Sequence, residues 1–172
     1  MTYLTRLAIT LLLAGGMLHA IPAVAHDYTQ GSVKIDHPWS RPTPPGVPTG
    51  VGYLAITNTG DSDITLTGAR TPRAAAVSLH RSTMSNGMMD MAPVAGGLTI
   101  KSGETVELKP HSYHLMLESL SESLKPGERV PLTLEFEGLA DVDVVLHVEP
   151  LDQADMDQGM DHSAHQMGGG GQ

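Results

Sequence analysis

The chain has 172 residues, of which 10 are basic and 19 acidic, and its formal net charge at pH 7 is −9. This balance argues against nucleic acid as a partner, because nucleic-acid binding needs basic side chains that neutralise phosphates. The chain has no cysteine. This excludes disulfides and a blue-copper electron carrier, whose metal requires a thiolate ligand.

Residues 1–25 predict a cleavable secretory signal. Arg6 precedes an apolar run at Leu7–Leu13, and the segment ends in Ala23-Val24-Ala25, which is typical of a cleavage site. Glycine and proline interrupt the apolar stretch, which is too short to span a bilayer comfortably. We therefore expect cleavage after Ala25, a periplasmic location and no stable membrane insertion.

The rest of the chain shows a hydrophobic period of two and frequent turn signals. A Pro-rich loop is expected at Arg41–Gly50, which contains four prolines. Later segments alternate apolar and polar residues, as half-buried strands do. Short strands with turns between them predict an all-β sandwich formed by one domain at residues 26–151. The alternating apolar residues are Leu132, Leu134, Phe136, Val142, Val144, Leu146 and Val148, and the turn signals are Asn58-Thr59-Gly60, Asn86-Gly87, Gly96-Gly97, Ser102-Gly103 and Pro126-Gly127.

The segment from His80 to Met91, HRSTMSNGMMDM, places methionines among polar residues. Any single methionine is more often a packing residue than a ligand, because its flexible side chain fills gaps in cores. Here its neighbours are Ser, Thr, Asn and Asp rather than an apolar run. The segment therefore predicts a metal-binding loop.

The segment Tyr113–Leu117, YHLML, predicts a strand. Successive side chains of a strand point to opposite faces, so His114 and Met116 share one face while the alternate residues face a core. A helix would separate His114 from Met116 around its circumference. We expect the strand to present this pair outwards.

Two imidazoles and two thioethers form the candidate metal site. Thioether sulfur is a soft, neutral ligand that hard cations ignore, whereas imidazole accepts several transition metals, so the mixed set favours copper(I). The residues are His80, Met91, His114 and Met116, with Met89 as an alternative to Met91.

Residues 152–172 form an acidic tail without basic residues or an apolar period, and we expect it to be disordered. The alternative to a solubilising tail is metal capture, because His- and Met-rich tracts bind metals. Imidazoles among carboxylates can accept copper(II) as well as copper(I). The tail ligands would be Met156, Met160, His162, His165 and Met167.

These residues resemble the motif of the periplasmic copper chaperone family PCuA(C), in which a His, ten residues and a Met precede a His-x-Met. Ten residues separate His80 from Met91, and 22 separate Met91 from His114, against about 21 in the family motif. The flanking segments are also similar to the family: HPWSRPTPPG at residues 37–46, GYLAITNTG at 52–60 and LKPHSYHLMLESL at 108–120.

The resemblance implies a cupredoxin-like Greek-key β-sandwich that binds copper(I) outside the cytoplasm and is not an enzyme. It also implies copper delivery by ligand exchange, towards the dinuclear copper site of cytochrome c oxidase. The partner would be an oxidase subunit or another copper chaperone, and we expect the protein itself to be a monomer. On this resemblance, His80, Met91, His114 and Met116 hold the copper.

Two other functions fit parts of the sequence. A copper storage or resistance protein would use the same ligands but never deliver the metal, so the sequence does not separate it from a chaperone. A copper oxygenase would use His26 as a new amino terminus, but no spacing in the chain pairs His26 with a second ligand.

Overall fold

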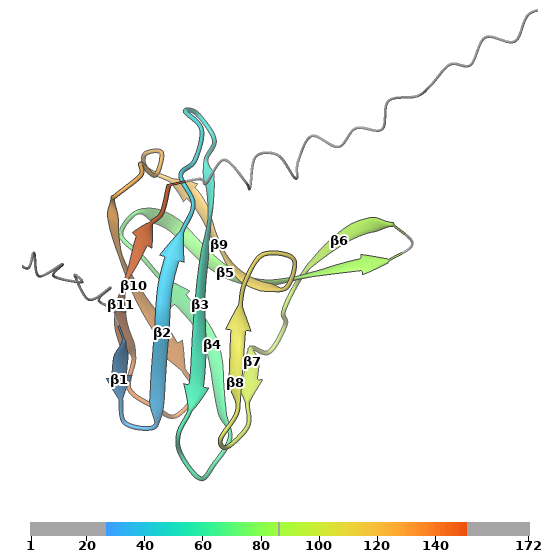
Figure 1. Cartoon of the computed structure of the whole chain (residues 1–172), viewed down its shortest axis with the longest axis vertical. Helices are drawn as coiled ribbons and strands as arrows, with labels where there is room; N and C mark the ends of the chain where they lie inside the picture. Colours follow the sequence, from blue (N-terminus) through green and yellow to red (C-terminus); the bar gives the residue numbers. More distant parts are fainter. Residues whose placement is uncertain (1–26, 86, 151–172) are drawn as a thin grey trace, which may run out of the picture.

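The computed structural model describes residues 27–85 and 87–150, and this part of the chain consists of β-strands joined by turns, without a helix (Figure 1). The predicted signal at 1–25 and the predicted tail at 152–172 lie outside the described residues. The strands are β1 (Tyr28–Gln30), β2 (Val33–Ser40), β3 (Thr49–Asn58), β4 (Ile64–Arg70), β5 (Ala74–Ser85), β6 (Met88–Pro93), β7 (Leu98–Ile100), β8 (Thr105–Leu108), β9 (Tyr113–Leu120), β10 (Arg129–Phe136) and β11 (Val142–Val148).

The sheet closes on itself. Its order runs β5, β9, β3, β2, β11, β10 and β4, and the pairing of Ala69 with Val77 joins β4 back to β5. Most neighbouring strands are antiparallel, but β11 pairs with β2 in parallel. The result is a flattened barrel with two packed faces (Figure 1).

Alternating burial along the strands forms the core. In β10 and β11 every second residue is buried, and in β9 Leu115 and Leu117 are 1% and 0% exposed. Burial of apolar side chains is the main stabilising term of such a fold. The predicted strand pattern is confirmed, and the glycines of the predicted turn signals fall between strands, at Gly60, Gly87, Gly96, Gly97, Gly103 and Gly127. The buried residues that alternate along β10 and β11 are Val130, Leu132, Leu134, Phe136, Val142, Val144, Leu146 and Val148.

Strand β5 changes neighbours along its length. One edge pairs with β9 from Ala74 to Arg81, while the other pairs with β4 at Val77 and with β6 from His80 to Ser85. Beyond Arg81 only β6 accompanies β5. The β5–β6 hairpin therefore projects from the barrel, as Figure 1 shows.

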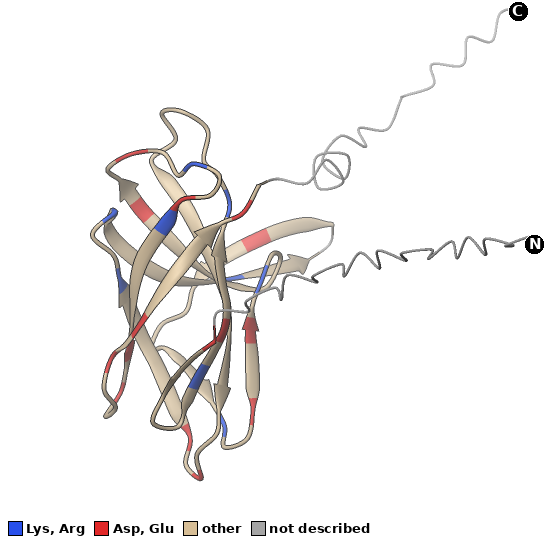
Figure 2. Cartoon of the chain, turned by 60° about the vertical axis from the view of Figure 1, so that its left-hand side comes forward, with Lys and Arg blue, Asp and Glu red and all other residues tan. Residues whose placement is uncertain are grey.

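Charged residues of both signs are interspersed over the strands and turns (Figure 2). On the β5–β6 hairpin, Arg81 and Asp90 are charged and exposed. Among the described residues, the structure has no helix long and apolar enough to cross a membrane.

Candidate metal centre

His80 and His114 are direct partners across β5 and β9. Their ring centres are 5.9 Å apart and the rings are inclined by 30°. Opposed residues of an antiparallel pair project to the same face of the sheet. The structure thus brings together the two histidines that the sequence predicts as ligands.

The two predicted methionines lie on either side of this pair and on the same face. Met116 is opposite Ser78 across β5 and β9, and Met91 is opposite Ser82 across β5 and β6. Every second residue of a strand points to the same face, so the side chains of Ser78, His80 and Ser82 on β5 share one face. Met116 therefore lies one position to one side of the imidazoles and Met91 one position to the other.

The opposite face of the same strands anchors this arrangement. Leu79 pairs with Leu115, and Val77 pairs with Leu117, so these apolar side chains pack into the barrel. The prediction that His114 and Met116 share the face away from the core is confirmed. Although it lies on this face, His114 is only 4% exposed.

The protonation of the His114 ring follows from its partner. Its Nδ1 lies 3.1 Å from the Ser112 carbonyl oxygen, and a carbonyl only accepts, so Nδ1–H is the donor. The same carbonyl accepts the backbone N–H of Ser82 at 3.0 Å. In the neutral ring Nε2 then carries the lone pair. This nitrogen is buried without a hydrogen-bond partner among the described residues.

A second chain of hydrogen bonds orients His80. The Ser78 hydroxyl donates to Glu118 Oε1, so its oxygen accepts from His80 Nε2–H, 3.0 Å away. In the neutral ring the lone pair is on Nδ1. That atom is also buried and has no hydrogen-bond partner within the described ranges. Each ring is thus fixed through one nitrogen and leaves the other unused.

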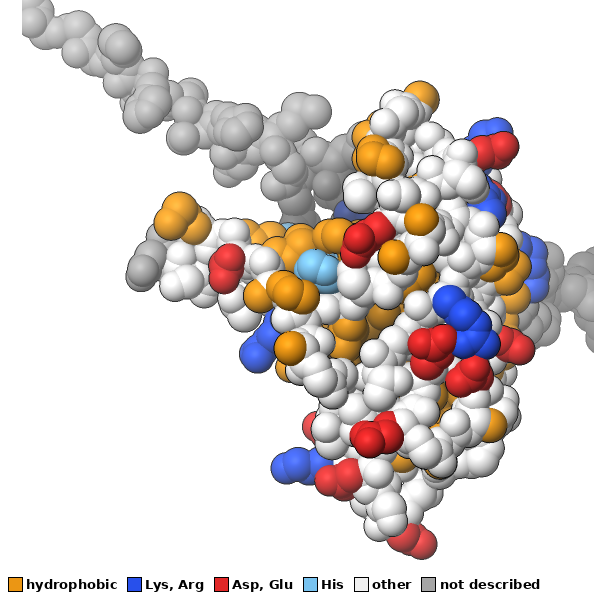
Figure 3. All heavy atoms as spheres, turned by 180° about the vertical axis from the view of Figure 1, so that it is seen from behind, with side chains coloured by type: hydrophobic (Ala, Val, Ile, Leu, Met, Phe, Trp, Pro, Cys, Tyr) orange, Lys and Arg blue, Asp and Glu red, His pale blue; other side chains and the backbone are white. Residues whose placement is uncertain are grey.

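The segment between His80 and Met91 differs from its prediction. It forms most of a β-hairpin rather than a loop, because the turn signal at Gly87 joins two segments that pair in register. Met89 shares the face of Met91 but is opposite Met84. This pair lies two residue pairs farther from the histidines than the pair of Met91 with Ser82. Figure 3 shows hydrophobic side chains on this hairpin and a histidine near its base.

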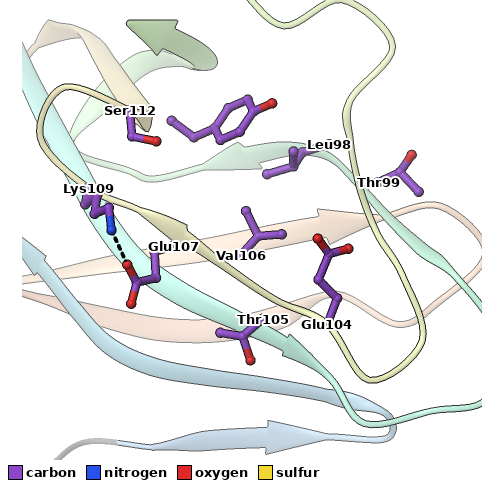
Figure 4. Close-up of a pocket in the computed structure, with 9 residues that line it drawn as sticks. Leu98, Thr99, Glu104, Thr105, Val106, Glu107, Lys109 and Ser112 are labelled. Atoms are coloured by element: carbon purple, nitrogen blue, oxygen red, sulfur yellow. Dashed lines mark hydrogen bonds and ion pairs between the residues drawn. The ribbon is translucent and has the colours of Figure 1, made fainter. Parts of the chain in front are cut away.

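A separate hollow of about 480 Å³ lies beside β7, β8 and the turn before β9 (Figure 4). Its lining includes Ser112 and Tyr113 but none of the predicted ligands. An ion pair between Lys109 and Glu107 borders it. Within residues 27–85 and 87–150, no three His, Asp or Glu side chains gather closely enough to hold a metal ion.

Sequence reasoning did not identify the residues that orient the imidazoles, namely Ser78, Ser112 and Glu118. Ser112 acts through its backbone carbonyl, so its residue type carries no signal. Ser78 does have one, since it precedes His80 by two positions. Residues two positions apart on a strand share a face. The predicted tail ligands Met156, Met160, His162, His165 and Met167 lie outside the described residues.

The model of the LpqE-like family, described as lipoproteins, matches residues 33–148. The protein Lxx21020 from Leifsonia xyli subsp. xyli, also named as a lipoprotein, is 31% identical over 133 residues, which cover 75% of this chain and 77% of that protein.

Solved structures have a similar fold. The copper-bound PCuAC domain from PmoF2 has a TM-score of 0.62 at 24% identity and matches 73% of this chain and 99% of that domain. Apo-DR1885 from Deinococcus radiodurans has a TM-score of 0.55 at 30% identity, covering 88% of this chain and 95% of that one. The copper(I) form of DR1885 has a TM-score of 0.51 at 30% identity, covering 74% and 81%. The predicted cupredoxin-like sandwich is confirmed.

Proposed function

The chain belongs to the LpqE-like family, and from this premise and the paired imidazoles we propose that it binds one copper(I) ion through His80 and His114. The similar solved structures support the proposal, because one is a copper-bound PCuAC domain and another is the copper(I) form of DR1885. Copper is here a cargo that the protein takes up and releases.

The observation that carries the proposal is the pair of unused ring nitrogens, His80 Nδ1 and His114 Nε2. A buried polar atom left without a partner costs about 1–3 kcal/mol, and a metal ion would remove that cost. A metal bound to an imidazole nitrogen at about 2 Å lies roughly 3 Å from the ring centre. Rings with centres 5.9 Å apart are therefore close enough to share one ion.

Thioethers from Met116 and Met91 would complete the site. Both lie on the face of the imidazoles, one position away on either side. Side chains at diagonal positions across a sheet are within reach of one another when they are long, as methionine is. Two nitrogens and two soft sulfurs favour copper(I) over hard cations and bind it without a thiolate.

Delivery rather than storage is favoured by the exposure of Met91. Its side chain is 47% exposed, whereas His114 is 4% exposed, so the ion would be accessible from the Met91 side. A neutral thioether binds weakly enough for a partner's ligand to replace it. We infer that copper leaves by ligand exchange, with Met91 released first.

In the cell, we propose, the chain is a periplasmic chaperone. It supplies copper towards the dinuclear site of cytochrome c oxidase, directly or through another chaperone. The family's lipoprotein description agrees with export from the cytoplasm. This chain nevertheless has no cysteine, the residue to which a bacterial lipoprotein's lipid would be attached. We propose a protein released by cleavage after Ala25.

The test is an anaerobic copper(I) competition titration of the exported chain and its His80→Ala and His114→Ala variants. Each variant should lose one tight equivalent, with affinity reduced by more than about 100-fold, since even groups that only orient a ligand contribute 10- to 100-fold. His111→Asn is the matched control, because His111 is exposed and asparagine tolerates its φ of 62°. Unchanged affinity in both alanine variants would refute the site.

Transfer to an acceptor separates delivery from storage. The copper-loaded chain is mixed with the apo copper-binding fragment of an oxidase subunit, and the copper on each protein is measured after separation. We expect copper to move to the acceptor. Retention of all copper by this chain would support the storage function.

A further inference from the structure

Four methionines of the β5–β6 hairpin are exposed to solvent. Their exposed fractions are 68% for Met84, 73% for Met88, 48% for Met89 and 47% for Met91. Such exposure excludes the usual packing role of methionine in a hydrophobic core. The hairpin projects from the barrel, so neither the core nor its stability accounts for these side chains (Figure 1).

The pairing of β5 with β6 sorts the four methionines onto two faces. Met84 is directly opposite Met89, and Met91 is two residues farther along β6, so these three share one face. Met88 is opposite Ser85 and projects from the other face. The face of the three methionines is also the face of His80, which lies on β5 four residues before Met84.

The side-chain spacing suits a shared ligand. Directly opposed residues have Cβ atoms about 4.5–5.5 Å apart, and diagonal neighbours about 7–8 Å, which long side chains bridge. Thioethers are neutral and polarizable, so several can surround a soft monovalent cation without repelling one another. Thr83, Ser85 and Asp90 lie on the opposite face of the hairpin, so no carboxylate of the hairpin competes with the three thioethers for the cation.

We propose that Met84 and Met89, together with Met91, form a second copper(I) site on the hairpin, which adjoins the imidazole site at its base and shares Met91 with it. All three ligands are thioethers, so the site selects soft monovalent cations and takes silver(I) as well. It binds more weakly than the site with imidazoles and lies more open to solvent.

The position of Met91 connects the two sites. It is a diagonal neighbour of Met84 across the hairpin and lies one position from His80 on the other side. Copper(I) captured by Met84 and Met89 passes to His80 and His114 when Met91 keeps its bond while the other ligands exchange. Neither an electron nor a proton is transferred in this step, because thioethers are neutral. The transfer rests on the proposed function, whereas the hairpin site does not.

The experiment is a silver(I) nitrate titration of the exported chain with ¹³C-labelled methionine methyl groups, followed by NMR. Met→Leu variants assign the signals and preserve side-chain volume. We expect the Met116 signal to shift with the first equivalent bound by the folded domain, and the Met84 and Met89 signals to shift together at higher silver. The Met88 signal should stay in place, because its side chain lies on the other face.

Variants test whether Met84 and Met89 act together. Met84→Leu should weaken the response of Met89 to silver by at least about tenfold, because it removes a proposed ligand and even groups that only orient a ligand contribute that much. Met88→Leu is the matched control on the same hairpin and should leave that response unchanged. Equal shifts of Met88, Met84 and Met89 would show non-specific thioether binding and overturn the proposal.

The remaining outcomes separate the two sites. A shift of Met116 without any shift of Met84 and Met89 would overturn the hairpin site, leave the proposed function intact and point to an apolar docking surface. Shifts of Met84 and Met89 without a response at Met116 would support the hairpin site and contradict the imidazole site of the proposed function.

Discussion

His80 on β5 and His114 on β9 are opposed across two paired strands, with ring centres 5.9 Å apart. Their register is held by the core on the opposite face, where Leu79 pairs with Leu115. A slip of one residue in a strand exchanges its two faces. The same apolar pairing that stabilises the barrel therefore determines that the two imidazoles meet.

Ser78 is expected to set which nitrogen of His80 is free. Its hydroxyl accepts from His80 Nε2–H and donates to Glu118, so Ser78→Ala removes the group that orients the ring. We expect the copper(I) affinity to fall by about tenfold, as for other groups bonded to a metal-binding imidazole. Copper(I) competition measures the affinity, and ¹⁵N chemical shifts of His80 report the tautomer.

Ser78→Thr is the control for this variant, because it keeps the hydroxyl and suits a strand. It should restore both the affinity and the Nε2–H tautomer. An alanine variant that retains the wild-type affinity and ¹⁵N shifts would show that the Ser78 hydroxyl does not orient the ring.

Met91 rather than Met89 is expected to be the sulfur ligand of the imidazole site. Met91 is opposite Ser82, whereas Met89 is opposite Met84, farther from the histidines. Met91→Leu and Met116→Leu should each weaken copper(I) binding at His80 and His114, and Met89→Leu should not. Because Met91 is 47% exposed, the Met91→Leu substitution should alter the free energy of unfolding by no more than about 0.5 kcal/mol.

Affinities from competition titration and urea unfolding midpoints check both parts of this prediction. A loss of affinity in Met89→Leu with none in Met91→Leu would reverse the assignment. A loss of folded protein in Met91→Leu would mean that the thioether stabilises the hairpin.

The tail at residues 152–172 is expected to capture additional copper. Deleting it removes Met156, Met160, His162, His165 and Met167, so total copper bound should fall while the tight site at His80 and His114 remains. Metal analysis after equilibrium dialysis gives the stoichiometry of the full and shortened chains. The same stoichiometry in both would show that the tail is only a solubilising extension.

Tyr53 makes stability depend on pH in the alkaline range. Burial raises its pKa above the ordinary value of 10.0, although nearby Arg41 opposes the shift. A raised pKa in the folded state means that the folded protein holds the phenol proton more tightly than the unfolded chain. Tyr53 therefore contributes stability below about pH 10, and this contribution is lost as the pH rises through the folded-state pKa.

Urea unfolding at pH 8 and pH 11 measures this effect, with Tyr53→Phe as the comparison. The wild-type protein should lose more stability between the two pH values than the variant, whose ring cannot ionise. Equal losses in both proteins would show that Tyr53 does not carry the dependence.

The sequence by itself determined the strands and the chemistry of the candidate ligands. Alternation along Leu132–Phe136 and Val142–Val148 predicted half-buried strands because a strand repeats every two residues. The same periodicity predicted that His114 and Met116 share a face. The absence of cysteine and the combination of imidazole with thioether favour copper(I) through the residue types alone, since ligand softness is a property of each side chain.

Only the tertiary structure decided how these residues meet. The register between β5 and β9 brings His80 opposite His114. This register depends on pairing between separate strands, and a local sequence pattern does not contain it. The fold also buries His114, and the pairing of β5 with β6 turns an expected loop into a projecting hairpin. The hydrogen bonds of the two rings are local, because Ser78 and Ser112 precede their histidines by two positions. The opposition of His80 and His114 arises from contact between distant segments, whereas periodicity reports only which face of its own strand a residue occupies.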